Sequence, residues 1–225
     1  QQLYEGVDIQ GLGTVGLITY LRTDSIRISE EADSNARNFI AENYGQEYVA
    51  AAPKTAESGK KIQDAHEAIR PTDISRTPAM VKESLSRDQF RLYQLIWKRF
   101  VASQMQAARF ETTSVKIDAG EYRFTVAASK IAFDGFRSVY VQPDEEKAEN
   151  NVLLKGLDEH SVLTKEEFDS KQHFTQPPAH YTEASLVKAL EELGIGRPST
   201  YAPTISTIIA RRYVAKENKN LYLTE

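Results

Sequence analysis

Apolar residues recur at helical spacing in the stretch between residues 29 and 45. Ser29 is a good N-cap, and the two glutamates that follow it suit the positive end of a helix dipole. The apolar face of this stretch consists of Ala32, Ala36, Phe39 and Ile40. Because Gly45 is a natural stop, the pattern predicts an amphipathic helix that ends before it.

A longer helical pattern begins at Ser86, where Gln89 completes a capping box. Its apolar stripe, which we expect to lie in the core, consists of Tyr93, Ile96, Trp97, Phe100 and Val101. We expect this helix to run to about Ala108. Residues 51–61 are small or charged without periodicity, which predicts a loop.

β-branched and aromatic residues dominate after residue 110. The predicted strands are residues 112–117, 122–133 and 136–141. Glycines at 120 and 135 suit hairpin turns between them. We therefore predict an antiparallel sheet, then a solvated loop over residues 142–151, and one or two further short strands before Gln176.

The last part of the chain has the order helix, tight turn, helix, hairpin. The first helix is capped by Thr182 and stops before Gly194, and Ser199 can cap the second. Residues 214–223 suit a β-hairpin. This order is the outline of a winged helix, which is a frequent nucleic-acid binder.

The composition of the chain excludes several kinds of functional site. The chain has 225 residues, is 40% hydrophobic, and carries no cysteine and a formal net charge of −4. The lack of cysteine excludes disulfides, thiolate zinc sites and a cysteine nucleophile. No apolar run approaches the ~18 residues of a membrane span. Residues 142–192 carry 12 acids and 5 lysines or arginines, whereas 194–225 carry 2 and 5, so we expect any polyanion to bind locally.

The run Gly-Leu-Ile-Thr-Tyr-Leu-Arg-Thr-Asp-Ser, which begins at Gly16, carries the strongest chemical signal. Residues 17–21 are β-rich, so we predict an extended segment in which Tyr20 and Arg22 project to the same side. A phenol with a pKa near ~10 is a poor nucleophile unless its anion is stabilised, and a guanidinium can do this. The alternative is a surface tyrosine beside an arginine.

A second block has the sequence Asp-Ala-His-Glu-Ala-Ile-Arg-Pro-Thr. We predict a short helix over residues 64–69, ended by Pro71, with His66 and Arg70 four residues apart on one face. Together these two side chains could hold a phosphate by charge-assisted hydrogen bonds. The alternative is a histidine satisfied locally and an arginine paired with Glu67 or solvent.

A third block, Gly-Ile-Gly-Arg-Pro-Ser-Thr-Tyr-Ala, covers residues 194–202. Its glycines let a ligand approach the backbone, the following helix presents free N–H groups, and Arg197, Ser199 and Thr200 add donors. This combination suits a DNA backbone phosphate, a contact that positions a strand without reading its sequence. The alternative is a plain connection between two helices.

In this order, the three blocks resemble the signatures of the bacterial type IA DNA topoisomerases, and the resemblance covers the chain from Gln1 to Glu225. The family patterns are Ile-Thr-Tyr-Met-Arg-Thr-Asp-Ser, Ala-His-Glu-Ala-Ile-Arg-Pro and Gly-Ile-Gly-Arg-Pro-Ser-Thr-Tyr-Ala. Leu21 replaces the methionine, which is a volume-conserving apolar exchange. His180 stands where the family commonly has arginine, and Arg212 where it commonly has glycine.

The resemblance implies that Tyr20 attacks a phosphodiester of single-stranded DNA and forms a 5′-phosphotyrosyl link, which religates without ATP after strand passage. It implies that Arg22 stabilises the phosphate charge and that His66 orients the scissile group. The implied DNA-binding residues are Arg70, Arg197, Ser199, Thr200 and Arg211.

The resemblance also implies a multidomain α+β fold. Residues 1–106 would form the helical, tyrosine-bearing domain, residues 107–178 a β-rich arch segment, and residues 179–225 a winged-helix-like segment that grips DNA. The chain does not begin with methionine, so we expect it to be part of a longer protein.

Type IA enzymes hold magnesium through an Asp-x-Asp and a glutamate on a separate domain, and no Asp-x-Asp-x-Glu occurs in this sequence. We therefore expect Mg²⁺ to be a cofactor of the parent enzyme, no metal in this part, and no activity of this part alone. The expected partners are DNA and the remaining domains of the parent, without a membrane. The expected location is the bacterial cytoplasm, at the nucleoid.

Three other functions fit parts of the sequence less well. A tyrosine recombinase requires a His-x-x-Arg pair, and His66 and Arg70 are spaced differently. A winged-helix regulator accounts for residues 179–225 but leaves the Tyr20 run unexplained. A structural scaffold accounts only for the β-rich part.

Overall fold

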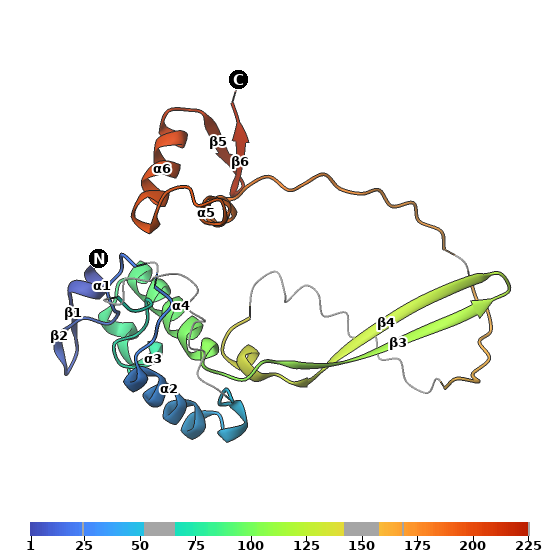
Figure 1. The fold of residues 1–225 in the computed structure, drawn as a ribbon, viewed down its shortest axis with the longest axis horizontal. Coiled ribbons are helices and arrows are strands. Elements are labelled where there is room, and N and C mark those ends of the chain that lie inside the picture. The colour runs from blue at the N-terminus through green and yellow to red at the C-terminus, as the bar shows by residue number, and fades with distance from the viewer. Residues whose placement is uncertain (24, 52–65, 142–157, 168, 225) are drawn as a thin grey trace. The chain divides into compact units, whose positions relative to one another are not determined.

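The computed structural model describes residues 1–23, 25–51, 66–141, 158–167 and 169–224. These residues combine helices with three separate two-stranded antiparallel sheets (Figure 1), which confirms the predicted α+β class. The chain divides into two compact units, residues 1–159 and 160–225. The division into three domains, with borders after residues 106 and 178, stays a prediction.

The first unit begins with helices and one small sheet. Its elements up to residue 103 are α1 (Gln2–Glu5), β1 (Val7–Ile9), β2 (Gly13–Val15), α2 (Glu30–Asn43), η1 (Gln46–Tyr48), α3 (Pro78–Val81), η2 (Lys82–Ser84) and α4 (Arg87–Ser103). The predicted caps of α2 and α4 are confirmed. Ser29 Oγ accepts a hydrogen bond from the N–H of Ala32, and Ser86 and Gln89 form a reciprocal capping box. Local sequence therefore determines where both long helices begin.

The core of the first unit is built on the predicted apolar faces of α2 and α4. Tyr93 is fully buried, and its hydroxyl donates to the carbonyl of Arg76 at 2.6 Å. Burial raises the pKa of the Tyr93 phenol well above its usual range. Trp97 Nε1 donates to the carbonyl of Ile74 at 2.9 Å. These two bonds tie α4 to the chain that precedes α3, so polar groups that enter the core there are satisfied.

α4 ends at Ser103, before the predicted end at Ala108. Beyond it the N–H of Gln106 donates to the carbonyl of Tyr48 at 2.8 Å, and Met105 forms an isolated antiparallel bridge with Val49. A longer helix would have needed these same backbone groups. Met105 is also buried, with 1% of its surface exposed, so tertiary pairing outweighs the helical pattern.

β3 (Arg109–Ala119) and β4 (Tyr122–Phe133) form a long hairpin with the predicted turn at Gly120, where φ is +63° (Figure 1). Cross-strand partners share a face, so the register places Val115, Ile117, Phe124 and Val126 together on one face near the turn. The ion pair between Glu111 and Lys130 lies on this same face, further from the turn. The opposite face carries the polar residues Thr112, Lys116, Asp118, Arg123 and Ser129. The two-stranded part of the predicted sheet is confirmed.

The prediction of a third strand over residues 136–141 is wrong. The chain instead forms η3 (Gly135–Ser138). Gly135 has a φ of +51°, and a Cβ there would lie 2.5 Å from the carbonyl oxygen of Gln106. The N–H of Phe136 donates to that same carbonyl at 2.9 Å. The chain is thus held against the end of α4 instead of returning along the hairpin.

The further strands predicted before Gln176 are not found in residues 158–167 and 169–176. The predicted loops over residues 51–61 and 142–151 lie outside the described residues, apart from Ala51. Among the helices that the structure describes, none is long and apolar enough to cross a membrane.

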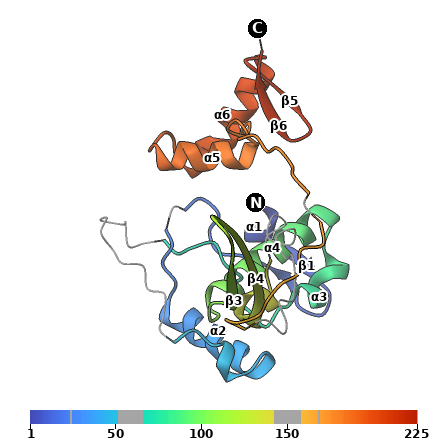
Figure 2. The ribbon, with the colours of Figure 1, turned by 90° about the vertical axis from the view of Figure 1, so that its right-hand side faces the viewer.

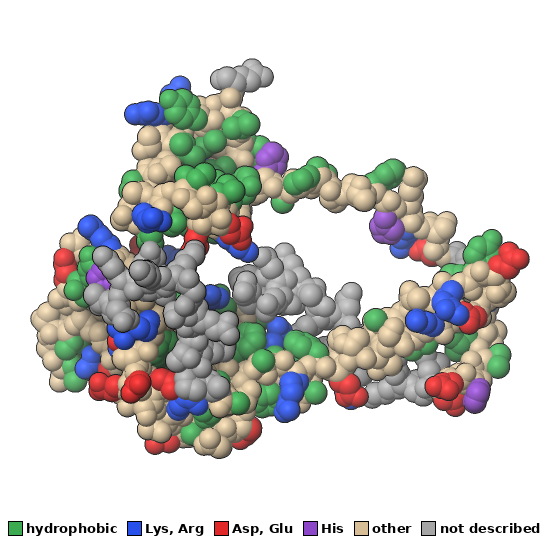
Figure 3. All heavy atoms as spheres, viewed as in Figure 1, with side chains coloured by type: hydrophobic (Ala, Val, Ile, Leu, Met, Phe, Trp, Pro, Cys, Tyr) green, Lys and Arg blue, Asp and Glu red, His purple; other side chains and the backbone are tan. Residues whose placement is uncertain are grey.

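The second unit follows the predicted order of helix, turn, helix and hairpin (Figure 2). Its elements are α5 (Glu183–Glu192), α6 (Pro198–Ala210), β5 (Val214–Glu217) and β6 (Asn220–Leu223). Thr182 caps α5 as predicted. Asn218 and Lys219 both have positive φ, as a tight hairpin turn requires. Hydrophobic side chains are visible on the surface of this unit in Figure 3. Leu193 and Ile195 are among its exposed large hydrophobic residues.

The second helix of this unit departs from the prediction at its start. α6 begins at Pro198 with Arg197 as the N-cap, so Ser199 is not the cap. The fixed φ of proline and its missing N–H suit the first helical position. At the other end Arg212 has a φ of +57°, a left-handed conformation that costs a non-glycine residue about 1 kcal/mol.

Replacing Arg212 with glycine is expected to stabilise the second unit by about 0.5–1 kcal/mol, because glycine adopts positive φ without steric cost. Hydrogen exchange of the α6 amides in the whole chain measures this change. Arg211→Gly is the matched control: its φ of −80° is ordinary, so glycine there is expected to speed exchange. Faster exchange in the Arg212→Gly variant would contradict the strain at this position.

Candidate active site

The tyrosine segment is held by pairing with a segment some fifty residues further along the chain. Ile18 and Pro71 form an isolated antiparallel bridge. The N–H of Thr19 donates to the carbonyl of Arg70 at 2.9 Å. The predicted extended pairing is therefore found at Ile18, where the segment is buried, and the chain bends at Thr19.

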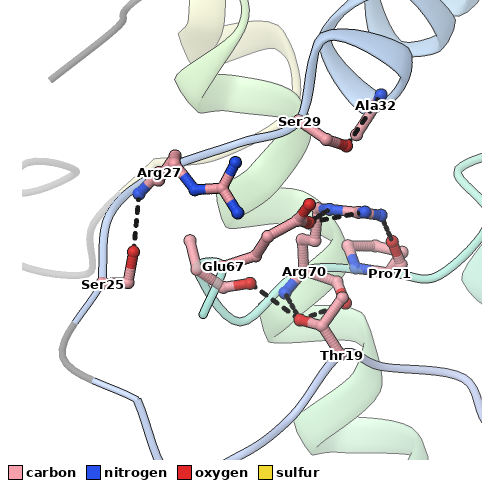
Figure 4. A network of polar contacts seen from close by, with 9 residues as sticks. Thr19, Ser25, Arg27, Ser29, Ala32, Glu67, Arg70 and Pro71 are labelled. Atoms are coloured by element: carbon pink, nitrogen blue, oxygen red, sulfur yellow. Dashed lines mark hydrogen bonds and ion pairs between the residues drawn. The ribbon is translucent and has the colours of Figure 1, made fainter. Parts of the chain in front are cut away.

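Thr19 adds its side chain to this pairing (Figure 4). Its Oγ1 donates to the carbonyl of Ala68 at 2.7 Å and accepts from the N–H of Arg70 at 2.9 Å. We call these two bonds, together with the backbone bond from Thr19 to Arg70, the Thr19 clamp. A hydroxyl can donate once and accept twice, so one side chain satisfies two backbone groups of the facing segment.

The predicted helix over residues 64–69 is not present in its described part, which begins at His66. The backbone groups that a helix would pair internally bond elsewhere. Arg70 bonds to Thr19, and the N–H of Ala68 donates to the carbonyl of Arg27 at 2.8 Å. His66 and Arg70 therefore do not share a helical face, and the argument that they hold one phosphate from such a face is wrong.

The extended conformation does not continue through Arg22. The chain bends at Leu21 and Arg22, so the strand geometry that would place Tyr20 and Arg22 on one side is absent. The side chains of both residues are exposed. A polar ligand can thus reach each of them from solvent.

Tyr20 lies in a short row of aromatic rings. Its ring centroid is 5.4 Å from that of His66, with the planes tilted by 48°, and 5.5 Å from that of Tyr4, in an edge-to-face arrangement. Tyr20 is 39% exposed. The structure therefore brings together Tyr20 and His66, two of the residues that the sequence singles out, and adds Tyr4.

Arg70 is held differently. Its guanidinium contacts the Glu67 carboxylate through two nitrogens, at 2.7 and 2.8 Å, and donates to the carbonyl of Pro71 at 2.9 Å (Figure 4). Only 14% of the Arg70 side chain is exposed. This is the pairing with Glu67 that the sequence left open as an alternative, and the role of Arg70 in DNA binding stays a prediction.

The third block lies in the second unit, at the start of α6. Gly194 and Gly196 have φ of +69° and +82°, and a Cβ on Gly196 would lie 2.9 Å from Thr200 Oγ1. That hydroxyl accepts from the N–H of Arg197 at 2.9 Å and donates to its carbonyl at 3.0 Å. The Thr200 hydroxyl is thus engaged in hydrogen bonds within the turn, whereas the side chains of Arg197 and Ser199 are exposed.

Arg211, the last predicted DNA-binding residue, is the C-cap of α6 and is exposed. His160, His173 and His180 are exposed, and the ring centroid of His180 lies 4.3 Å from that of Tyr222 with the planes tilted by 43°.

A depression of about 570 Å³ runs along α2 and residues 70–75. Arg70 and Asp73 contribute to its walls, and Phe39 and Phe100 are among its apolar lining residues. Neither Tyr20 nor His66 lines it. The depression therefore does not hold the candidate nucleophile.

Sequence reasoning missed two residues that shape the site, Thr19 and Tyr4. Thr19 lies inside the first block, but its partners Ala68 and Arg70 are distant in sequence and only the fold identifies them. Tyr4 lies outside every block. No local signal distinguishes it from other exposed tyrosines.

Thr19→Val keeps the shape of the side chain but removes the hydroxyl, which leaves the Ala68 carbonyl and the Arg70 N–H without their side-chain partner. We expect the free energy of unfolding of the first unit to fall by about 1–3 kcal/mol. The single tryptophan, Trp97, lies in the core of this unit, so its fluorescence during denaturant unfolding measures the change. Thr19→Ser, which keeps the hydroxyl, is expected to lose much less; equal losses would contradict the clamp.

Comparison with known proteins agrees with the three blocks. A family model described as DNA topoisomerase matches residues 1–225. The structure of full-length topoisomerase I from Thermotoga maritima, in a monoclinic crystal form, is 40% identical to this chain with a TM-score of 0.75. The match covers 100% of this chain and 35% of that one. The chain therefore belongs to the bacterial type IA DNA topoisomerase family.

Proposed function

We propose that this chain supplies the nucleophile and part of the DNA-binding surface of an enzyme that relaxes negative supercoils without ATP. The observation that carries the proposal is the position of Tyr20. Its side chain is 39% exposed, lies against His66, and directly follows the Thr19 clamp. A nucleophile has to be reachable by a bulky substrate and yet be placed by a rigid neighbour, and Tyr20 meets both conditions.

The proposed reaction is a transesterification. The phenolic oxygen of Tyr20 attacks the phosphorus of a phosphodiester in single-stranded DNA. The new bond joins the tyrosine to the 5′-phosphate, the bond from phosphorus to the 3′-oxygen breaks, and the phenol's proton ends on the 3′-hydroxyl. After strand passage that hydroxyl attacks the phosphotyrosine and restores the DNA. One ester replaces another, so the step needs no ATP.

Arg22 and His66 are the proposed helpers at the scissile phosphate. Arg22 is exposed two residues after Tyr20, and a guanidinium stabilises the charge that gathers on phosphate oxygens. His66 lies beside the Tyr20 ring, so a phosphate at the phenol is within its reach. We assign it the orientation of the scissile group.

Arg197, Ser199, Thr200 and Arg211 are the proposed contacts to the DNA backbone in the second unit. Arg197, Ser199 and Arg211 are exposed at the ends of α6. Thr200 contributes mainly by shaping the turn, since its hydroxyl is bonded to Arg197. A phosphate at Arg70 has to compete with Glu67, so Arg70 is the weakest of the proposed DNA contacts.

Mg²⁺ is proposed as a cofactor of the parent enzyme, held by residues outside this chain. Within the residues that the structure describes, no group of three or more His, Cys, Asp or Glu is placed to hold a metal ion. The described residues therefore offer no such cluster to a magnesium ion. The proposed partners are DNA and the other domains of the parent, in the bacterial cytoplasm at the nucleoid.

Tyr20→Phe in a complete topoisomerase that contains these residues removes only the attacking oxygen. We expect covalent protein–DNA adducts to fall below detection, while the affinity for single-stranded DNA changes by no more than about twofold. Adducts trapped by denaturant and resolved on a gel provide the measurement. Tyr122→Phe, at an exposed tyrosine of the hairpin, is the control and should leave adduct formation unchanged. Adducts in the Tyr20→Phe enzyme would rule out the proposed nucleophile.

The 225-residue chain alone is expected not to relax supercoiled plasmid, with or without Mg²⁺, because the acidic residues assigned to magnesium lie outside it. An agarose gel of plasmid topoisomers checks this, with a complete type IA topoisomerase as the positive control. Relaxation by the pure chain would contradict the assignment of the metal-binding residues to another domain.

A further inference from the structure

Tyr4 contacts the candidate nucleophile but has no role in the chemistry described above. The edge of one ring meets the face of the other, with centroids 5.5 Å apart and planes at 68°. This is one of the preferred arrangements of aromatic pairs. Tyr4 is itself 40% exposed, so burying Tyr4 in the core does not explain its position.

The backbone of Tyr4 is fixed by the chain that leads to Tyr20. The carbonyl of the preceding residue, Leu3, accepts hydrogen bonds from the N–H groups of Leu17 and Ile18, at 2.7 and 3.2 Å. Leu3 is 3% exposed. The ring of Tyr4 is therefore presented from a rigid element.

Gly16 gives an independent indication of how closely these two segments approach. A Cβ added there would lie 2.6 Å from the carbonyl oxygen of Tyr4. The φ of Gly16 is not in the left-handed region. The requirement for glycine is therefore steric, and the atom that imposes it belongs to Tyr4.

The Thr19 clamp holds the backbone before Tyr20, but the chain bends directly after it. Among the described residues, the aromatic rings that contact the Tyr20 ring are those of Tyr4 and His66. His66 adjoins residues outside the described part of the chain, whereas Tyr4 is anchored by Leu3. The anchored neighbour is the one suited to define a rotamer.

We propose that Tyr4 is a positioning residue, whose ring holds the Tyr20 side chain in the orientation from which its oxygen attacks DNA. This inference rests on the proposed function of Tyr20. The interaction is between rings, so the hydroxyl of Tyr4 is not required. Loss of the ring leaves Tyr20 present but spread over several rotamers, which lowers the rate of attack without changing how DNA is bound.

The first test compares Tyr4→Leu with Tyr4→Phe in a complete topoisomerase that contains these residues. Tyr4→Leu is expected to lower the single-turnover rate constant of adduct formation about two- to tenfold, the range for one aromatic pair, with an unchanged dissociation constant for single-stranded DNA. Tyr4→Phe is expected to restore the wild-type rate constant. Equal rate constants in the wild type and the leucine variant would overturn the proposal, as would equal losses in both variants.

Gly16→Ala moves the backbone of Tyr4 without changing an aromatic side chain. It is expected to slow adduct formation in the same way as Tyr4→Leu. Because an added Cβ could also unfold the segment, the variant counts only if its thermal unfolding midpoint lies close to that of Tyr4→Leu. A folded Gly16→Ala enzyme with the wild-type rate constant would contradict the proposal that the position of Tyr4 sets the orientation of the Tyr20 ring.

The second test needs no catalysis and therefore separates this inference from the proposed function. In the 225-residue chain, the ring protons of Tyr20 are expected to show ring-current shifts in the NMR spectrum that Tyr4→Leu abolishes and Tyr4→Phe retains. Tyr122→Leu, at a tyrosine of the hairpin, is the control and should leave them unchanged. Unchanged Tyr20 shifts in Tyr4→Leu would overturn the positioning role even if Tyr20 proves to be the nucleophile.

Discussion

The candidate site depends on three hydrogen bonds made by Thr19. They join the segment that ends at Tyr20 to residues 68–70, which lie about fifty positions further along the chain. They extend the Ile18–Pro71 bridge up to the residue before Tyr20, where the chain bends and where residues 66–70 form no helix. The clamp therefore helps to keep the segment that contains His66 beside Tyr20. A polar group in this position stabilises by about 1 kcal/mol per bond, but its larger effect is to select one register of the two segments.

The two units divide the proposed work. In the first, a packed helical core around Tyr93 and Trp97 supports the tyrosine segment, so the nucleophile is placed by a rigid element. In the second, an exposed helix start and the preceding glycine turn present Arg197 and Ser199 to solvent. In phosphoryl transfer, the protein contributes mainly by positioning the reacting groups and by stabilising the charge on the phosphate. A buried support for the nucleophile and an exposed surface for the DNA backbone suit these two requirements.

Features set by neighbouring residues could be predicted from the sequence. The caps at Ser29, Ser86 and Thr182 and the hairpin turn at Gly120 are of this kind, and all four are confirmed. The errors fall where distant segments compete for the same backbone groups. Residues 68–71 pair with the tyrosine segment, residues 105–106 pair with residues 48–49, and Gly135 lies against Gln106. In the site, resemblance identified Tyr20 and His66, whereas Tyr4 and the partners of Thr19 required the fold.

The central claim is that the oxygen of Tyr20 becomes bonded to DNA. Its most direct test is to trap the covalent complex of a complete topoisomerase with a single-stranded oligonucleotide, digest the protein and the DNA, and locate the modified residue by mass spectrometry. The account predicts a nucleotide 5′-phosphate on the peptide that contains Tyr20. A phosphate linked to any other side chain, including the neighbouring Tyr4, would contradict it.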